Sequence, residues 1–160
     1  MRKIFLALIA TVSLLSTSCN NKLENSEEFV GSYISHYNTV GSVTIGTFMG
    51  DYSIPIDEQD ITTFSIILGQ ADNEVIIVGL EGTSGSVVGI VDKKKITFEE
   101  TFTDTFDGAL ITATATGSGH LEEDKLTYTI TTTGTGTASV EGMLVSAKIN
   151  LVTEGVATED

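Results

Sequence analysis

From Phe29 onward, apolar and polar residues alternate with a period of two, and clusters of Gly, Asn and Asp interrupt the alternation. Successive side chains of a strand point to opposite faces, so this alternation predicts strands with one buried and one solvated face. The clearest examples are residues 96–103, 111–117 and 126–131, where apolar residues alternate with Thr. Turn signals at intervals of about 8–12 residues are typical of an all-β sandwich or barrel.

The turns divide the chain into eight or nine expected antiparallel strands. They fall at residues 29–37, 42–53, 62–68, 74–80, 87–91, 96–103, 111–117, 126–131 and 143–151. Residues 54–60 hold Pro55 and several acids, so a loop is expected there because proline cannot donate to a ladder. The barrel domain is expected to span residues 29–152, with a frayed tail at 153–160.

Short links between strands exclude parallel crossovers, which need a dozen or more residues. A consecutive meander closes most simply into an up-and-down barrel without exposed edges, and a two-sheet β-sandwich is the alternative. The middle strands, around Ile66, Ile76 and Val88, are apolar on both faces. Such strands are covered on both sides, and we favour partial covering by the chain itself over a protein contact.

The N-terminal 18 residues have the layout of a secretory signal peptide. Arg2 and Lys3 precede an apolar run at residues 4–15, and three small residues follow. A transmembrane helix needs about 17–25 apolar residues, so this run is too short to span a bilayer. Cys19, the only cysteine, comes next, and residues 20–28 form a polar tether to the domain.

The small residues and Cys19 resemble a bacterial lipoprotein signal, in which the cysteine becomes the lipid-modified N-terminus. The usual Leu three positions before the cysteine is here Ser16, and this relaxed form, followed by Asn20 and Asn21, resembles lipoproteins of the Bacteroidetes type. The resemblance implies lipidation at Cys19 and an outer-membrane location, on either face. Each buried CH₂ of an acyl chain contributes about 0.8 kcal/mol, so several chains hold a domain at a bilayer. The alternative is an ordinary signal peptide followed by an unpaired thiol.

Acidic residues dominate the charge of the chain. It carries 22 acids against 8 bases, a net charge of −14. Phosphate backbones repel such a domain, which excludes nucleic acid as an expected partner. Anionic lipid surfaces repel it too, so the acyl chains are the expected membrane contact.

The meander and the opening FVGSY resemble the lipocalin-like, or calycin-like, barrels of Bacteroidetes-type lipoproteins. The resemblance covers residues 29–152, and the lipocalin Gly-x-Trp signature is absent because the chain has no Trp. Such barrels hold ligands in the lumen, and small inward residues leave room for one. The candidate lumen residues are Phe98, Phe102, Ala113, Ala115 and Tyr128.

Other candidate sites carry weaker signals. Alternate threonines from Thr127 to Thr137 are expected to share a solvated face, interrupted by Gly134 and Gly136; the sharper alternative is a hydroxyl array for carbohydrate or ice. His36 and His120 lack the spacing of a metal site, and the acidic clusters lack that of a calcium loop. No metal or cofactor is therefore expected.

No catalytic motif is present, so a non-enzymatic role is expected. The first hypothesis is a lipid-anchored envelope protein that binds a small apolar ligand. The second is a structural or interaction module, such as an adhesin or a subunit of a surface complex. The weakest is a hydrolase that uses the loop carboxylates Asp104 and Asp107.

Overall fold

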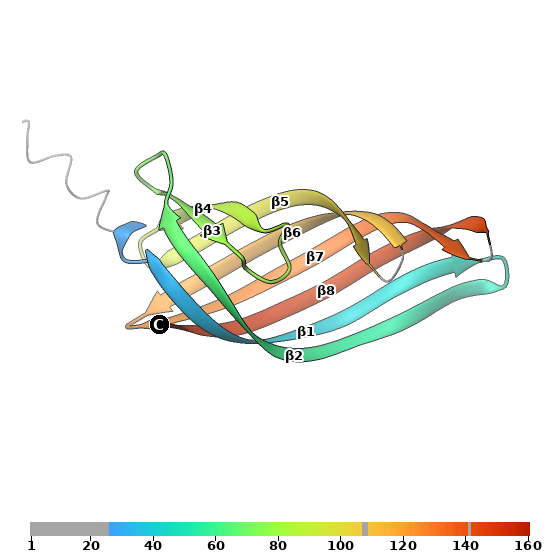
Figure 1. Cartoon of the computed structure of the whole chain (residues 1–160), viewed down its shortest axis with the longest axis horizontal. Coiled ribbons are helices and arrows are strands. Elements are labelled where there is room, and N and C mark those ends of the chain that lie inside the picture. Colours follow the sequence, from blue (N-terminus) through green and yellow to red (C-terminus); the bar gives the residue numbers. More distant parts are fainter. Residues whose placement is uncertain (1–25, 107–108, 141) are drawn as a thin grey trace, which may run out of the picture.

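The computed structural model describes residues 26–106, 109–140 and 142–160. They form one antiparallel sheet that curls round and closes on itself (Figure 1). Its strands are β1 (Gly31–Thr47), β2 (Gly50–Leu68), β3 (Glu74–Val78), β4 (Ser86–Asp92), β5 (Lys95–Phe106), β6 (Ala109–Glu122), β7 (Lys125–Val140) and β8 (Met143–Glu159). Each strand pairs with its sequence neighbours, and β1 pairs with β8 to close the ring. The predicted all-β up-and-down barrel is confirmed, and the alternative sandwich is wrong.

The barrel has two unlike halves because β3 and β4 are short. β2 pairs with β3 only over residues 65–68, and β5 pairs with β4 only over residues 95–98. All eight strands therefore meet only at one end, the closed end, where the described chain begins and ends. Towards the opposite end, the far end, six long strands continue alone, and the β1–β2, β5–β6 and β7–β8 turns lie there (Figure 1).

The closed half is filled by aromatic and branched side chains. Phe29, at the end of a helical turn, is fully buried, and the hydroxyl of Tyr33 donates to its carbonyl over 2.8 Å. The ring of Phe64 stacks on Tyr33 at 5.3 Å and meets Tyr128 edge-on at 6.0 Å. This geometry favours aromatic pairs beyond their burial, so the rings form the centre of the core.

Two glycines make room for these rings. A Cβ on Gly117 would overlap the ring of Phe98, and a Cβ on Gly155 would overlap the ring of Tyr128. Both glycines lie opposite the ring that covers them in the paired strand. Each ring thus lies flat over the backbone of its neighbour instead of pointing across the lumen.

The far half has a second core made mostly of small residues. Its buried members are Val43, Ala109, Ile111, Ala113, Ala138, Ala147 and Ile149. Small side chains let the opposing walls of the sheet approach each other, so this half is packed although β3 and β4 do not reach it.

The β3–β4 loop covers the side of the barrel that the short strands leave open. Leu80 is buried in the core of the closed half, and Gly82 lies against Ile130 and Thr153. The backbone N–H of Ser84 donates to Glu100 of β5 over 3.0 Å, and the Ser84 hydroxyl donates to the other oxygen of the same carboxylate. The loop therefore connects the free edge of β5, through Glu100, to the core of the closed half, through Leu80.

The loop expected at residues 54–60 is wrong, because these residues belong to β2. They pair with β1, Pro55 lying opposite Ser42, and β3 does not extend to them. The N–H of Ile61 points away from β1, to the Asp60 carboxylate. Backbone groups of a strand point to the same side at every second residue, and Pro55 is six residues before Ile61. The nitrogen of Pro55 therefore faces the unpaired edge of β2, where no hydrogen-bond donor is needed.

The frayed tail expected at residues 153–160 is also wrong. β8 continues to Glu159 and pairs with both β1 and β7, and the N–H of Asp160 donates to the carbonyl of Ser32 over 2.9 Å. Thr153 and Ala157 are buried on the inner face. The barrel domain thus extends to the end of β8, beyond the expected boundary at residue 152.

Candidate functional site

The five residues predicted to line the lumen all face the interior of the barrel. Phe98, Ala113, Ala115 and Tyr128 are buried, and Phe102 is half-buried and packs against both core clusters. Because Phe98 and Tyr128 pack over glycines and against other core side chains, they contribute to the core itself. A ligand in this half would have to displace them, and ligand binding in the lumen stays a prediction.

Between the two apolar clusters the interior carries a belt of hydroxyl groups. The hydroxyls of Ser35 and Tyr128 bond over 2.8 Å, and those of Thr39 and Thr153 bond over 2.8 Å. Burial raises the pKa of Tyr128, and the charge of Glu81 raises it further, while the bond to Ser35 lowers it. These pairs satisfy buried polar groups that would otherwise cost free energy of folding.

Tyr37 belongs to the same belt but lies near the unpaired edge of β2. Burial raises the pKa of Tyr37, and the carboxylates of Glu81, Asp60 and Glu58 raise it further. A phenol close to several carboxylates stays protonated and is a hydrogen-bond donor at neutral pH. Tyr37 and Tyr128 are therefore protonated at neutral pH, and neither phenol is in the form that acts as a base or nucleophile.

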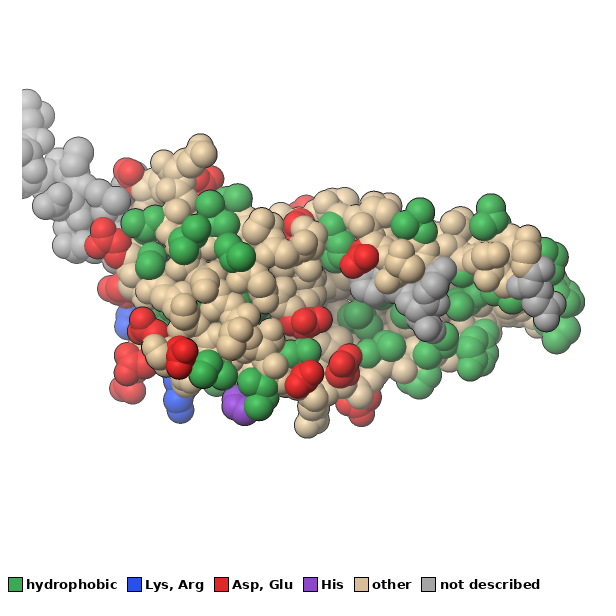
Figure 2. Space-filling view, in the orientation of Figure 1, with side chains coloured by type: hydrophobic (Ala, Val, Ile, Leu, Met, Phe, Trp, Pro, Cys, Tyr) green, Lys and Arg blue, Asp and Glu red, His purple; other side chains and the backbone are tan. Residues whose placement is uncertain are grey.

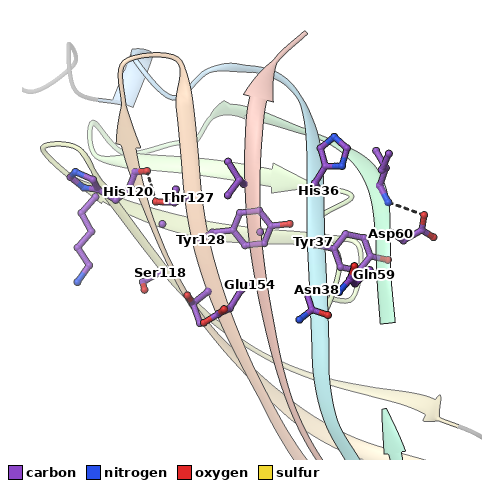
Figure 3. Close-up of a pocket in the computed structure, with 16 residues that line it drawn as sticks. His36, Tyr37, Asn38, Gln59, Asp60, Ser118, His120, Thr127, Tyr128 and Glu154 are labelled. Carbon is purple, nitrogen blue, oxygen red and sulfur yellow. Dashed lines mark hydrogen bonds between the residues drawn. The ribbon is translucent and has the colours of Figure 1, made fainter. Parts of the chain in front are cut away.

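A groove of about 990 Å³ runs over the outer face of the sheet, across β2, β1, β8, β7, β6 and the start of β5 (Figure 3). His36 and His120 lie on opposite sides of it, in one row of paired residues through Val156 and Thr127. Two strands separate the histidines, so one metal ion cannot bind both. The described residues contain no group of three or more His, Cys, Asp or Glu side chains able to hold a metal ion.

Asn38 lies in the wall of this groove, and its Oδ1 atom is buried without a hydrogen-bond partner among the described residues. The groove was missed by sequence reasoning, because it depends on the register that aligns side chains of six strands. Its lining combines hydroxyl, amide, imidazole and charged groups with the apolar side chains of Ile61 and Val156 and the rings of Tyr37 and Tyr128.

The alternate threonines of β7, from Thr127 to Thr137, share one exposed face, as expected. The predicted interruption at Gly134 and Gly136 is wrong, because β7 continues through both glycines, which sit on the inward-facing side. Thr101 and Thr103 of β5 bond the facing threonines Thr114 and Thr112 of β6 over 3.0 and 2.9 Å. Cross-strand hydroxyl pairs of this kind stabilise a sheet, which accounts for the composition of this face.

A flat apolar patch covers the outer face of β2, β3 and β4 at the closed end. It consists of Ile67, Ile76, Val78, Val88 and Ile90. Ile67, Ile76 and Val88 stand side by side in one row of paired residues, and all but the partly buried Ile76 are 41–50% exposed. Within the described part of the chain, the covering of the patch is partial, and the exposed fractions leave it accessible to a partner.

The flat patch continues into a hollow of about 750 Å³ on the outer face of β4 to β7. Val88 and Ile90 lie on one side of the hollow, and Thr97, Thr116 and Thr129 belong to its lining. An apolar centre beside a rim of hydroxyl groups is the usual composition of a protein interface.

A second exposed apolar cluster, the apolar tip, lies at the far end (Figure 2). It consists of Phe48, Met49, Tyr52, Leu110, Met143 and Leu144. Phe48, Met49 and Leu144 are 86, 83 and 79% exposed. Isolated exposed apolar residues are ordinary, but six large ones around one end of the molecule mark an interaction surface.

The remaining predicted sites fall partly outside the described residues. Cys19 and the leader lie outside them, as does Asp107 of the proposed carboxylate pair. The Asp104 carboxylate accepts from the N–H of Thr105 over 2.7 Å at the edge of β5. This contact gives Asp104 a structural role.

No family model, curated protein or solved structure matches this chain. Among the described residues, no helix is long and apolar enough to cross a membrane.

Proposed function

We propose that this chain is a lipid-anchored protein of the cell envelope, at the outer membrane, whose barrel is a non-enzymatic interaction module for another protein. The observation that carries the proposal is the flat apolar patch of Ile67, Ile76, Val78, Val88 and Ile90. The leader and Cys19 support the anchor, and the neighbouring threonine hollow supports an interface with a polar rim.

The shape and chemistry of the patch favour a protein partner. Its side chains are mostly β-branched and stand in neighbouring strands of one sheet face, so a flat partner surface can contact all of them together. Burying apolar area contributes roughly 25 cal/mol per Å², which makes an exposed patch of this kind an effective site for association. The nearby backbone is held in paired strands, so little conformational entropy is lost on binding.

The experiment is crosslinking of the lipidated protein in its native envelope, followed by purification and mass spectrometry. Val88→Asp/Ile90→Asp places two charges in the patch and is expected to abolish the crosslinked species that the parent forms. Thr135→Asp/Thr137→Asp adds the same charge on the outer face of β7, outside the patch and the hollow, and is the matched control. A parent protein that forms no crosslinked species, or a patch variant that forms it undiminished, would contradict the proposal.

A further inference from the structure

The apolar tip differs in shape from the flat patch. Phe48 and Met49 occupy the turn between β1 and β2, at the very end of the molecule. Leu110 and Leu144 stand on the outer face of the sheet, whereas Tyr52 and Met143 occupy strand positions that alternate onto the inner face. The exposed side chains therefore point outward in several directions around a convex end.

A convex end of this kind is a poor fit to a second copy of the chain or to a flat protein. A standard interface buries about 800 Å² on each partner. Side chains on both faces of the sheet and at its turn cannot all contact one rigid surface at once. A lipid bilayer is fluid and closes around a convex apolar object from every side, so it can cover all six.

The local charge also favours a neutral lipid surface. Around the three turns at this end, residues 45–54, 104–112 and 139–147 carry four acids, Asp51, Asp104, Asp107 and Glu141, and no Lys or Arg. The chain as a whole carries a net charge of −14 and few bases, so an anionic lipid surface would repel it. A surface of zwitterionic headgroups presents no such penalty.

From these observations we propose that the apolar tip inserts into the interfacial region of a lipid bilayer of zwitterionic lipids. Phe48, Met49 and Leu144 enter the boundary between headgroups and acyl chains, and Tyr52 lies at the headgroup level, as amphipathic aromatic side chains do. This inference concerns a different surface from the flat patch and does not depend on the proposed function. It gives the protein a membrane contact at the end opposite to the one where the described chain begins (Figure 1).

The test is flotation of the unlipidated chain, residues 20–160, with vesicles of pure phosphatidylcholine. This segment contains every strand of the barrel and lacks both the leader and Cys19, so neither can hold it to the vesicles. The parent is expected to float with the vesicles. Phe48→Ser/Met49→Ser/Leu144→Ser is expected to lower the bound-to-free ratio about tenfold or more, since each large side chain contributes to partitioning. Replacing a third of the lipid by phosphatidylglycerol is expected to weaken binding by the parent.

The matched control is Val78→Ser/Val88→Ser/Ile90→Ser, which removes as many apolar side chains from the flat patch. It is expected to float as well as the parent. Circular dichroism of each variant checks that the barrel is intact, and Leu144→Ser alone, which is expected to lower binding to a smaller degree, replaces the triple variant if that one fails to fold. The inference is overturned if the parent does not float, if the tip variant floats equally, or if both triple variants lose binding to the same degree. A tip-dependent dimer in sedimentation analysis, with no vesicle binding, also overturns it.

Discussion

At the scale of single residues, glycines in register with aromatic rings determine how the lumen is filled. Gly117 lies opposite Phe98 and Gly155 lies opposite Tyr128 in the neighbouring strands. The sequence predicts that the rings point inward, but the contacts depend on register, which alternation alone does not give. Ala113, Ala115 and Gly117 were expected to leave room for a ligand. They instead let the aromatic rings lie close to the backbone and the opposing walls of the sheet come close together.

Substitution of Gly117 tests this packing. Gly117→Ala places a Cβ where the ring of Phe98 lies, so it is expected to lower the free energy of unfolding by about 1–3 kcal/mol. Urea unfolding followed by circular dichroism measures the change. Ser118→Ala, on the exposed face one residue away, is the control and is expected to change stability by less than about 0.5 kcal/mol. Equal stability of Gly117→Ala and the parent would show that the ring is not packed over the glycine.

The buried tyrosines make the stability of the barrel depend on alkaline pH. Burial raises the pKa of Tyr33 and of Tyr128 above the ordinary value of about 10, with the charge of Glu159 adding to the first and that of Glu81 to the second. As pH rises past 10, the unfolded chain loses these phenol protons first and binds fewer protons than the folded chain. The free energy of unfolding is therefore expected to fall with pH in this range, and not between pH 7 and 9.

Tyr128→Phe is the variant that checks this pH dependence. Above pH 10 its free energy of unfolding is expected to fall less steeply than that of the parent, because one raised pKa is gone. At pH 8 the variant is expected to be about 1 kcal/mol less stable, since it loses the bond to Ser35. Urea titrations from pH 8 to 11 give both quantities. Parallel slopes for parent and variant would exclude Tyr128 as a source of the dependence.

At the scale of strands, the two edges exposed by the short β3 and β4 are protected by their own side chains. The Asp60 carboxylate accepts from the N–H of Ile61 on β2, and the Asp104 carboxylate accepts from the N–H of Thr105 on β5, each over 2.7 Å. Pro55 removes a further donor from the β2 edge. Prolines and inward-pointing charges are known means of preventing sheets from pairing edge to edge.

Removing both carboxylates is expected to make the protein self-associate. Asp60→Ala/Asp104→Ala leaves two edge N–H groups without these acceptors and lowers the repulsion between copies. Size-exclusion chromatography with light scattering is expected to show dimers or larger species that the parent lacks. Asp57→Ala/Glu99→Ala removes the same charge from the same two strands, at exposed positions, and is expected to stay as the parent. A monomeric Asp60→Ala/Asp104→Ala would show that the edges need no such protection.

Three strand errors show what the sequence could not supply. Besides the loop at 54–60 and the tail at 153–160, one strand was expected at residues 42–53, whereas β1 continues to Thr47 and the turn lies at Phe48 and Met49. Alternation predicts the type of nearly every strand and the meander order, because period two is a local signal. Pro55 and the acids after it predict a loop. They can lie in a strand because that part of β2 has no partner on one side, and the sequence does not show that β3 pairs only with residues 65–68. Residues 153–160 look too polar for a strand until their inward members, among them Ala157, are placed between β1 and β7. The flat patch could be predicted from the apolar runs of the middle strands. The apolar tip could not, because its residues come from separate turns that only the fold brings to one end.

At the scale of the whole molecule, the barrel separates two unlike surfaces along its length. The flat patch lies at the closed end, where the described chain begins, and the apolar tip lies at the other end (Figures 1 and 2). β1 alone has 17 residues, which at about 3.3 Å per residue span roughly 56 Å of strand. Strand tilt shortens this along the barrel axis, yet it leaves the two surfaces too far apart for one small partner to cover both.

The anchor itself gives the last prediction, because it decides which end faces the host bilayer. The mature protein is expected to begin at an acylated Cys19, and intact-mass analysis of the purified membrane form is expected to show the added acyl mass. In a background that carries Phe48→Ser/Met49→Ser/Leu144→Ser, which removes the proposed tip contact, Cys19→Ala is expected to move the protein from the membrane fraction to the soluble fraction, since the acyl chains are then the remaining proposed membrane contact. Its melting temperature is expected to match that of the same background with Cys19 intact, because the core clusters lie within residues 29–157. Ser18→Ala in this background, beside the cysteine, is the control and is expected to stay membrane-bound.

A mature chain that begins with an unmodified residue, or a Cys19→Ala protein of this background that stays fully in the membrane fraction, would contradict lipidation at Cys19. Neither outcome would change the description of the barrel.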